Sequence, residues 1–495
     1  MPQIYGIKHN ISGAVNNLYM NVFSSDKLPE GANCTMENFL KGKKHIHFIG
    51  IGGSGMYPLA QILHKQGYFL TGSDNNETET LKAVRAMGIP VYMGQRAENI
   101  EGADLIVHTA AIMADNPELI AAKASGAQVI ERSVLLGLVT SMYDNAVCVC
   151  GTHGKTTTTS MLTHIFLADG NDLTAVIGGK LKAIGGSGIC GTSDTMVCEA
   201  CEFVDTFLKL YPDTAVVLNI DCDHLDYFRT MENMKRSFTK FCNMTTKLIV
   251  YNGDDANTVE AVSAAKETKA RLVTFGSSDG NDYYPANIKH ISDFNTEFDL
   301  YHSGSLVGRA AIHVPGEHNV LNAVAAIAAA LENGCRFESA VKGLAEFHGA
   351  VRRFEKLAEV NGITFVDDYA HHPTEVRSLL ETAKAMNFRR VWAVHQPFTY
   401  SRTATLLNEF ADALSIADRV VLTEIMGSRE KNTYNIYSKD LAEKIDGAVW
   451  FPTFDEVADY VVKNAESGDL VITLGCGDVY KVGYLMIEKL GGKLL

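Results

Sequence analysis

The chain has 495 residues, which is too long for one hydrophobic core and predicts two to four domains. Its hydrophobic content of 46% and charged content of 21% are typical of globular proteins that fold in water. The formal net charge is −14 and no long basic run occurs, so we expect neither nucleic acid nor an anionic membrane surface as a partner. No apolar stretch reaches about 18 residues, so no membrane insertion is expected.

Residues 1–43 show little periodicity and are rich in Asn, Ser, Gly and Lys. We expect them to form an N-terminal extension without visible chemistry. The first 40 residues also lack the basic start and apolar core of a secretory signal. The ten cysteines are scattered, and several fall in apolar strands where a free thiol behaves as a small hydrophobe. A cytoplasmic location is therefore expected.

A strand, a glycine-rich turn and a helix follow from residue 44 onward. Residues 45–49 predict the strand, residues 56–66 the helix, and the turn between them fits G-x-G-x-x-G. A second strand ends at Asp74, about 20 positions beyond the turn, where an acidic residue can bond a ribose hydroxyl. The pattern predicts a site for a nucleotide diphosphate, unless the glycines serve only close packing of strand and helix. Its residues are Gly50, Gly52, Gly53, Ser54, Gly55 and Asp74.

A second glycine turn, at residues 151–154, begins another α/β unit. An apolar strand precedes the turn and a helix follows Lys155, so backbone N–H groups and the helix dipole make an anion site there. Lys155 adds a positive charge for terminal phosphates, and the Thr156 hydroxyl can bind Mg²⁺. The usual P-loop has glycine at position 149, where this chain has Val149. This shortened variant predicts a nucleoside triphosphate site; the alternative is a Thr-rich helix start with one solvated lysine.

Acidic residues and a histidine follow two further strands of this unit. We expect the strands at 195–198 and 214–218, and parallel strands bind ligands at their carboxyl ends. Glu202 follows the first strand and is the preferred Mg²⁺ ligand, because hard oxygen atoms suit that ion. His224 follows the second strand. Judged by residue type alone, such a histidine is more often a hydrogen-bonded loop residue than a ligand.

An Ala-rich helix and a third alternating unit complete the chain. Residues 285–315 are strand-like, and the helix is expected over 320–332, with Asn319 placed to cap it or to face a ligand. Beyond Val351 the strands of a third parallel unit are expected at 363–369, 390–394, 419–422 and 470–474.

Seven short motifs, taken in chain order, resemble those of the Mur ligase family, the ATP-dependent amide ligases of peptidoglycan precursor synthesis. They are H-F-I-G-I-G-G-S-G-M at 47–56, G-T-H-G-K-T-T-T at 151–158, D-x-D-H-x-D at 221–226, G-x-H-N at 316–319, R-R-F at 352–354, D-D-Y-A-H-H-P-T-E-V at 367–376 and Q-P-x-x-Y-S-R-T at 396–403. The resemblance implies an α/β protein of three domains. These are a Rossmann-like domain at 44–145 that binds a UDP-linked substrate, a P-loop-type ATPase domain at 146–348, and a Rossmann-like domain at 349–495 that binds the amino acid and ATP.

The resemblance also implies the reaction. ATP would phosphorylate the lactyl carboxylate of UDP-N-acetylmuramate, and the amine of L-alanine would then attack the acyl phosphate. ATP and Mg²⁺ are the implied cofactors, and a monomer or weak homodimer is expected. Positioning and charge neutralisation would supply most of the rate acceleration.

Roles for individual residues follow from the matched motifs. The implied ATP phosphate site is Gly151, Thr152, His153, Gly154, Lys155, Thr156 and Thr157. The resemblance implies one Mg²⁺ at Thr156 and Glu202 and a second Mg²⁺ at His224. For His224 this replaces the hydrogen-bonded loop role that residue type alone favoured. Asn319 would face adenine, and Arg353 and Asp368 would hold the ATP ribose and phosphates. His371 and Arg402 would lie in the amino-acid and acyl-phosphate pocket, and they complete the catalytic set with Lys155, Glu202 and His224.

The chain departs from the family pattern at two places that bear on function. Many members have E-A-D-E-S-D where this chain has Cys201, Phe203 and Val204 at the third, fifth and sixth positions. Many also have histidine, and often arginine, where Phe398 and Thr399 stand, which leaves the acceptor amine open. Some members carry a carbamylated lysine, for which no residue is assigned here. The rival interpretations are a ligase for a murein tripeptide, a nicotinamide-dependent oxidoreductase and a non-catalytic nucleotide sensor.

Overall fold

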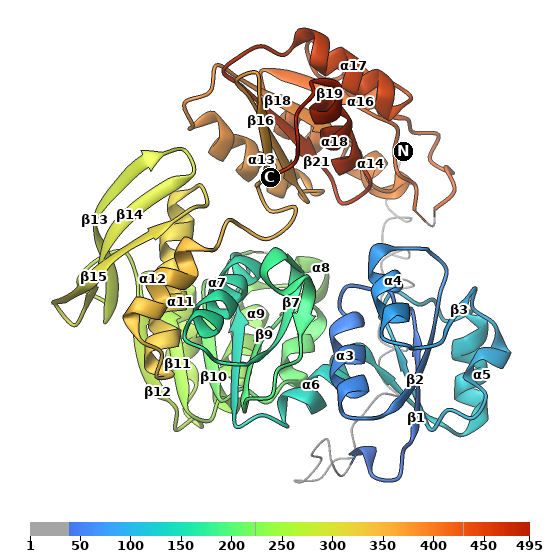
Figure 1. The fold of residues 1–495 in the computed structure, drawn as a ribbon, viewed down its shortest axis with the longest axis vertical. Coiled ribbons are helices and arrows are strands. Elements are labelled where there is room, and N and C mark those ends of the chain that lie inside the picture. Colours follow the sequence, from blue (N-terminus) through green and yellow to red (C-terminus); the bar gives the residue numbers. More distant parts are fainter. Residues whose placement is uncertain (1–38, 223, 429) are drawn as a thin grey trace, which may run out of the picture. The chain divides into compact units, whose positions relative to one another are not determined.

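The computed structural model describes residues 39–222, 224–428 and 430–495, so most of the expected N-terminal extension lies outside the described residues. The chain forms two compact units (Figure 1). Unit 1 comprises the chain up to Asn287 together with Phe298–Ala310 and Leu321–Glu346, and unit 2 comprises Ile288–Glu297, Ala311–Val320 and Phe347–Leu495. Two segments that precede residue 349 in the sequence thus belong to the same compact unit as the C-terminal region.

The first sheet of unit 1 has five parallel strands in the order β3-β2-β1-β4-β5. The strands are β1 (His45–Ile49), β2 (Phe69–Asp74), β3 (Val91–Met93), β4 (Leu105–His108) and β5 (Gln128–Glu131), and the helices are α3 (Tyr57–Lys65), α4 (Glu79–Ala86), α5 (Pro117–Ser125) and α6 (Arg132–Thr140). Alternation along β1 sends Phe48 into one apolar core and Ile49 into a second. Both faces are therefore buried, as expected for a parallel sheet covered by helices. This strand order is Rossmann-like, which confirms the predicted fold class.

A second sheet, whose strands lie mostly in unit 1, has ten strands in the order β15-β14-β13-β12-β11-β10-β6-β9-β7-β8. Its strands are β6 (Asn145–Cys150), β7 (Thr174–Leu181), β8 (Gly186–Ile189), β9 (Thr195–Glu199), β10 (Thr214–Val217), β11 (Leu248–Asn252), β12 (Arg271–Phe275), β13 (Tyr283–Ser292), β14 (Asn295–His302) and β15 (Ser305–Ile312). The main helices are α7 (Lys155–Ala168), α9 (Met231–Met244), α10 (Ala256–Ala264), α11 (Glu317–Glu332) and α12 (Phe337–Ala345). The Ala-rich helix begins at Glu317, so Asn319 lies in its first turn and does not precede it.

The sheet of unit 2 has six strands in the order β16-β17-β21-β18-β19-β20, with β16 antiparallel at one edge. Its strands are β16 (Glu355–Val360), β17 (Ile363–Asp368), β18 (Arg390–His395), β19 (Arg419–Leu422), β20 (Val449–Trp450) and β21 (Asp469–Leu474). The helices include α13 (Pro373–Lys384), α14 (Tyr400–Thr405), α15 (Leu407–Leu414), α16 (Ser438–Ala442), α17 (Phe454–Asn464) and α18 (Tyr480–Lys489). Separate apolar cores cover its two faces, with Val391 in one and Trp392 in the other.

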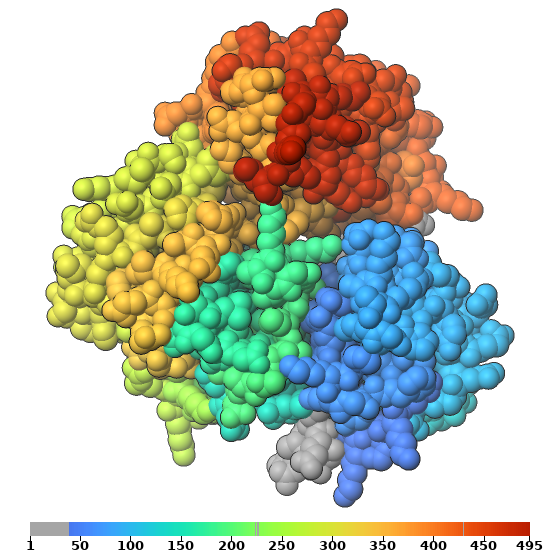
Figure 2. All heavy atoms as spheres, viewed as in Figure 1, coloured from blue at the N-terminus to red at the C-terminus, as the bar shows by residue number. Residues whose placement is uncertain are grey.

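Within unit 1 the first domain packs directly on the P-loop domain (Figures 1 and 2). The Ser187 hydroxyl donates to the Ser54 carbonyl at 2.7 Å, and Lys65 Nζ donates to the Cys190 carbonyl at 2.7 Å. Gly137 of α6 approaches the Lys209 backbone so closely that an added Cβ would lie 2.0 Å from its carbonyl oxygen. The two glycine turns thereby belong to one compact unit. Among the described residues, no helix is both long and apolar enough to cross a membrane.

Candidate active site

The first glycine turn is held in shape by the end of β2. The amides of Gly50 and Ile51 donate to the Ser73 carbonyl at 2.8 and 3.0 Å, and the amide of Gly52 donates to Asp74 Oδ2 at 2.9 Å. A Cβ at position 52 would itself lie 2.9 Å from that carboxylate oxygen, so only glycine allows this approach. The carboxylate expected to bond a ribose therefore supports the turn.

Two amides of this turn remain for an anion. The Gly53 amide donates to the Gly50 carbonyl, which closes the turn. Within the described part of the chain, the amides of Ser54 and Gly55 donate no hydrogen bond. Both precede α3 at the carboxyl end of β1, where open parallel sheets bind ligands. Both amides can therefore donate to an anion bound at this turn.

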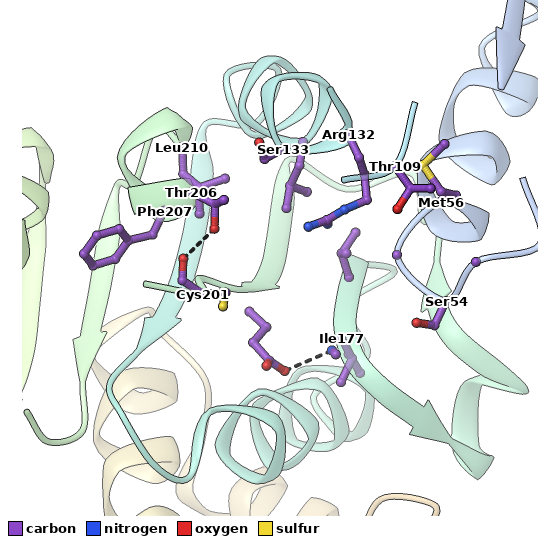
Figure 3. A pocket seen from close by; sticks show the side chains of 16 residues that line it. Ser54, Met56, Thr109, Arg132, Ser133, Ile177, Cys201, Thr206, Phe207 and Leu210 are labelled. Carbon is purple, nitrogen blue, oxygen red and sulfur yellow. Dashed lines mark hydrogen bonds between the residues drawn. The ribbon is translucent and has the colours of Figure 1, made fainter. Parts of the chain in front are cut away.

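A cavity of about 330 Å³ runs from this turn into the P-loop domain (Figure 3). The first domain contributes Ser54, Met56 and Arg132 to its lining, and the P-loop domain contributes Glu199 and Cys201. The Arg132 guanidinium points into the cavity and also lies against Gly55, whose added Cβ would be 3.1 Å from the arginine side chain.

Arg132 is a candidate functional residue that the sequence analysis missed. It is the first residue of α6, directly after the carboxyl end of β5. A basic residue at the end of a parallel strand is the signal that could have identified it.

The P-loop variant forms a turn at the start of α7. Gly151 and Gly154 have φ values of +139° and +85°, which favour glycine. The Thr152 amide donates to the Asn219 carbonyl at 3.0 Å, and the His153 amide donates to Asn219 Oδ1 at 2.8 Å. A Cβ at Gly154 would lie 2.5 Å from Asn322 Oδ1, so α11 packs against the turn. Residues 151–157 thus lie together as a turn and a helix N-terminus, the arrangement that binds phosphate.

Lys155 is folded back over this turn. Its Nζ donates to the carbonyls of Gly151 and Thr152 at 2.6 and 3.0 Å and lies 3.0 Å from Glu202 Oε2. Burial lowers the pKa of Lys155, but the nearby carboxylates of Glu202 and Glu199 raise it by more than burial lowers it. The pKa of Lys155 is therefore higher than that of an ordinary lysine. The lysine is therefore a fixed cation, with its charge balanced by the wholly buried Glu202.

Thr156 pairs with Glu199 and not with Glu202. The Thr156 hydroxyl donates to Glu199 Oε2 at 2.9 Å, and the Gly178 amide donates to the same oxygen at 2.9 Å. Residue type and the matched motif had both favoured Glu202 as the partner of Thr156. Glu199 is the last residue of β9 and is in register with Val149 of β6, which places it beside the P-loop.

His224 lies near Glu202 in a tightly bent segment. Its Nε2 is 3.9 Å from Glu202 Oε1, and its ring lies 4.7 Å from the Phe203 ring. His224, Val204 and Asp205 all have φ values between +52° and +56°. Such values are unfavourable for a β-branched residue and cluster at functional sites. Unit 1 thus brings Lys155, Glu202 and His224 close together.

In unit 2 the predicted residues gather at the carboxyl ends of β17 and β18. Asp368 accepts hydrogen bonds from the amides of Phe354 and Ala370 at 2.7 and 2.8 Å. Burial raises its pKa, and Arg353 only partly offsets this effect. The Arg353 guanidinium lies 5.7 Å from the centre of the Tyr369 ring.

The neighbouring His371 and Arg402 also lie together, since Arg402 Nη1 donates to the His371 carbonyl at 3.4 Å. Burial lowers the pKa of His371, and Arg402 and Arg353 lower it further, while Glu375 opposes the change. Its imidazole is therefore neutral at neutral pH. Asn319, by contrast, uses its side-chain amide to donate to the Pro315 carbonyl at 2.6 Å.

The residues that depart from the family pattern form a short bend before α14. Phe398 forms a bridge with Met426, and the Thr399 amide donates to the Met426 carbonyl at 3.0 Å with φ at +63°. Ser401 donates to Glu430 from both its amide, at 2.8 Å, and its hydroxyl, at 2.5 Å. Phe398 and Thr399 therefore contribute backbone contacts at positions where many members carry histidine or arginine, and Arg402 is one of the basic side chains beside His371.

A buried histidine at the carboxyl end of β18 makes a testable contribution to the stability of unit 2. His395 is 1% exposed, its Nδ1 lies 3.0 Å from the Leu474 carbonyl, and burial lowers its pKa to about 4. An unfolded histidine has a pKa of about 6.5. The unfolded state therefore binds a proton on this histidine more tightly than the folded state does. The folding stability that depends on the neutral imidazole is present above about pH 6.5 and is lost as the pH falls toward 4.

We expect the wild type to lose about 2 kcal/mol more stability than His395→Asn between pH 7 and pH 5. The asparagine amide can still donate to the Leu474 carbonyl but does not titrate. Both tryptophans, Trp392 and Trp450, lie in unit 2, so urea unfolding followed by tryptophan fluorescence reports on that unit. Equal losses in the two proteins would contradict the assignment.

The fold and the site, with a P-loop variant at the start of α7, are those of an enzyme that uses a nucleoside triphosphate. Three family descriptions match the chain: "Mur ligase family, catalytic domain" at residues 45–143, "Mur ligase middle domain" at 149–330 and "Mur ligase, glutamate ligase domain" at 352–477. The chain belongs to the Mur ligase family, as the motifs predicted.

Individual relatives agree with this assignment. A UDP-N-acetylmuramate–L-alanine ligase of Acetivibrio thermocellus is 43% identical over 452 residues, which are 90% of this chain and 96% of that protein. The enzyme of the same name from Caldanaerobacter subterraneus is 41% identical over 460 residues, 92% of this chain and 99% of that protein. The crystal structure of UDP-N-acetylmuramate–alanine ligase from Thermotoga maritima has a TM-score of 0.76 at 28% identity and covers 91% of this chain and 99% of its own.

Proposed function

We propose that the protein joins L-alanine to the lactyl carboxylate of UDP-N-acetylmuramate at the expense of ATP. The observation that carries the proposal is the cavity of unit 1. It is continuous from the free amides of the first glycine turn to Glu199 beside the P-loop. A nucleotide-sugar bound by its diphosphate at Ser54 and Gly55 can therefore extend its carboxylate toward the terminal phosphate of ATP.

The first chemical step is phosphoryl transfer to that carboxylate, which gives an acyl phosphate and ADP. Lys155 neutralises charge on the transferring group, because its buried cation already faces the turn that holds the phosphates. Arg132 holds the acceptor carboxylate or the adjoining diphosphate, since its guanidinium enters the cavity that the first glycine turn lines together with Glu199.

The residues at the P-loop also fit a Mg²⁺ ion. Thr156 and Glu199 present a hydroxyl and a carboxylate, which are hard oxygen donors of the kind that Mg²⁺ prefers. No group of three or more His, Cys, Asp or Glu side chains in the described ranges is arranged to hold a metal alone, which suits an ion that also binds substrate phosphates. When bound there, Mg²⁺ would neutralise phosphate charge. We propose Thr156 and Glu199 as its protein ligands, in place of Thr156 and Glu202.

The second step is attack of the amine on the acyl phosphate, with loss of phosphate. The ammonium group of the amino acid must first lose a proton. His371 is suited to accept it, because its lowered pKa keeps it neutral at neutral pH. Arg402 lies against the His371 backbone and is suited to hold the carboxylate of the amino acid.

The acceptor is tested by following ADP release with ATP, Mg²⁺ and UDP-N-acetylmuramate. L-alanine, glycine, L-serine and the murein tripeptide are supplied separately at equal concentration. We expect L-alanine to give the highest kcat/KM, in agreement with the names of the relatives at 41–43% identity. ADP release with tripeptide alone would replace L-alanine by the recycling substrate, and no ADP with any acceptor would exclude the ligase activity.

A further inference from the structure

Arg352 is the first arginine of the R-R-F motif and has no role in the two reaction steps proposed above. Its guanidinium nevertheless makes three hydrogen bonds within unit 2. Its Nε donates to Asp367 Oδ2 at 2.8 Å, its Nη1 donates to the Gly477 carbonyl at 3.0 Å, and its Nη2 donates to the Gly475 carbonyl. These three bonds use the planar fork that distinguishes arginine from lysine.

Two aromatic rings hold the same guanidinium. Its central carbon lies 5.1 Å from the centre of the Tyr369 ring and 4.9 Å from that of Tyr480. Such cation–π contacts strengthen when the cation is shielded from water, and the Arg352 side chain is only 17% exposed. The guanidinium therefore joins the end of β17, the turn after β21 and the first residue of α18.

The backbone around this arginine is held in an unfavourable conformation. Arg352 and Phe354 have φ values of +61° and +46°, on either side of Arg353. Non-glycine residues keep such values only when surrounding contacts fix them. The Arg352 amide donates to Glu355 Oε2 at 2.9 Å, and the Phe354 amide donates to Asp368 at 2.7 Å. Arg352 is thus fixed directly beside Arg353, and the Phe354 amide ties the same bend to Asp368.

We propose that Arg352 is a positioning residue for the ATP-binding edge of unit 2. It fixes the turn at Gly475–Gly477 against β17 and thereby sets Arg353 and Asp368, without touching the nucleotide itself. This proposal rests on the ATP role of Arg353 and Asp368 in the proposed function. In this proposal Arg352 fixes the positions of the neighbouring residues, and Arg353 makes the contact with ATP.

Arg390 provides a matched control in the same sheet. Its guanidinium also pairs with a buried aspartate, at 2.7 Å from Asp469 Oδ2, and lies 5.5 Å from the Trp392 ring. Arg390 begins β18 and Asp469 begins β21. Because the strands are parallel, this pair lies at the opposite edge from the ligand-binding ends. It has similar chemistry but no predicted contact with a substrate.

The test compares Arg352→Lys with Arg390→Lys. Lysine keeps the charge beside the aspartate but cannot bond both glycine carbonyls and the carboxylate at once. For Arg352→Lys we expect KM for ATP and the calorimetric Kd for ATP to rise at least tenfold, with KM for UDP-N-acetylmuramate within twofold of wild type. For Arg390→Lys we expect both ATP constants to stay within twofold. Tryptophan fluorescence during urea unfolding measures the stability of unit 2 in each variant.

Tyr480→Leu serves as a second variant, because it loosens the same guanidinium without leaving Asp367 unpaired. We expect it to raise KM for ATP severalfold, and it tests the proposal even where Arg352→Lys fails to fold. ATP constants within twofold of wild type in Arg352→Lys and Tyr480→Leu, or an equal rise in Arg390→Lys, would overturn the positioning role. If wild type binds ATP but releases no ADP with any acceptor, the ligase function fails, and the Kd comparison still decides the role of Arg352.

Discussion

Lys155→Ala is expected to lower kcat/KM for ATP by at least about 10³-fold, equivalent to about 4 kcal/mol of transition-state stabilisation. The lysine is held over the P-loop carbonyls by bonds of 2.6 and 3.0 Å, at the turn proposed to bind the phosphates. Removing it also leaves the buried Glu202 without its cation beside the phosphate site. ADP release measured at varied ATP gives both kinetic constants.

Lys235→Ala is the matched control for this experiment. The two lysine side chains are 13% and 14% exposed, and each has a carboxylate partner at 3.0 or 2.7 Å. Lys235 lies on α9 and pairs with Glu260, away from the P-loop turn. We expect its replacement to leave kcat/KM within twofold of wild type. Near-normal turnover of Lys155→Ala, or an equal loss in Lys235→Ala, would remove Lys155 from the mechanism.

Glu199→Gln is expected to lower kcat by about 10²-fold or more and to raise the Mg²⁺ concentration needed for half-maximal activity. The substitution keeps the size of the side chain but removes the charge beside the Thr156 hydroxyl, 2.9 Å away. The measurement is ADP release at saturating ATP over a range of Mg²⁺ concentrations.

Glu202→Gln is the comparison that separates the two assignments. Glu202 is wholly buried on Lys155, so its replacement should loosen the lysine and raise KM for ATP. We expect the Mg²⁺ dependence of this variant to stay as in wild type. A shifted Mg²⁺ requirement in Glu202→Gln and an unchanged one in Glu199→Gln would restore Glu202 as the ligand that the motif implied.

Local sequence patterns predicted most of the fold, because apolar periodicity and glycine turns act over a few residues. The strand–turn–helix units around Gly50–Gly55 and Gly151–Gly154 are present as expected, and the strands of the last domain fall where their apolar runs are. The Ala-rich helix begins at Glu317, three residues before the expected start at residue 320. Helix ends depend on contacts beyond the local pattern.

The sequence alone determined the family, because its motifs are short and contiguous, and it predicted the sets of residues proposed to carry the chemistry. Only the tertiary structure decided which of these residues contact one another. Register between β6 and β9 places Glu199, and not Glu202, beside Thr156. Packing of the first domain on the P-loop domain brings Arg132 into the cavity with Glu199. These pairings join strand ends that are distant in the chain, and their distances follow from sheet register and domain packing, which no local spacing encodes.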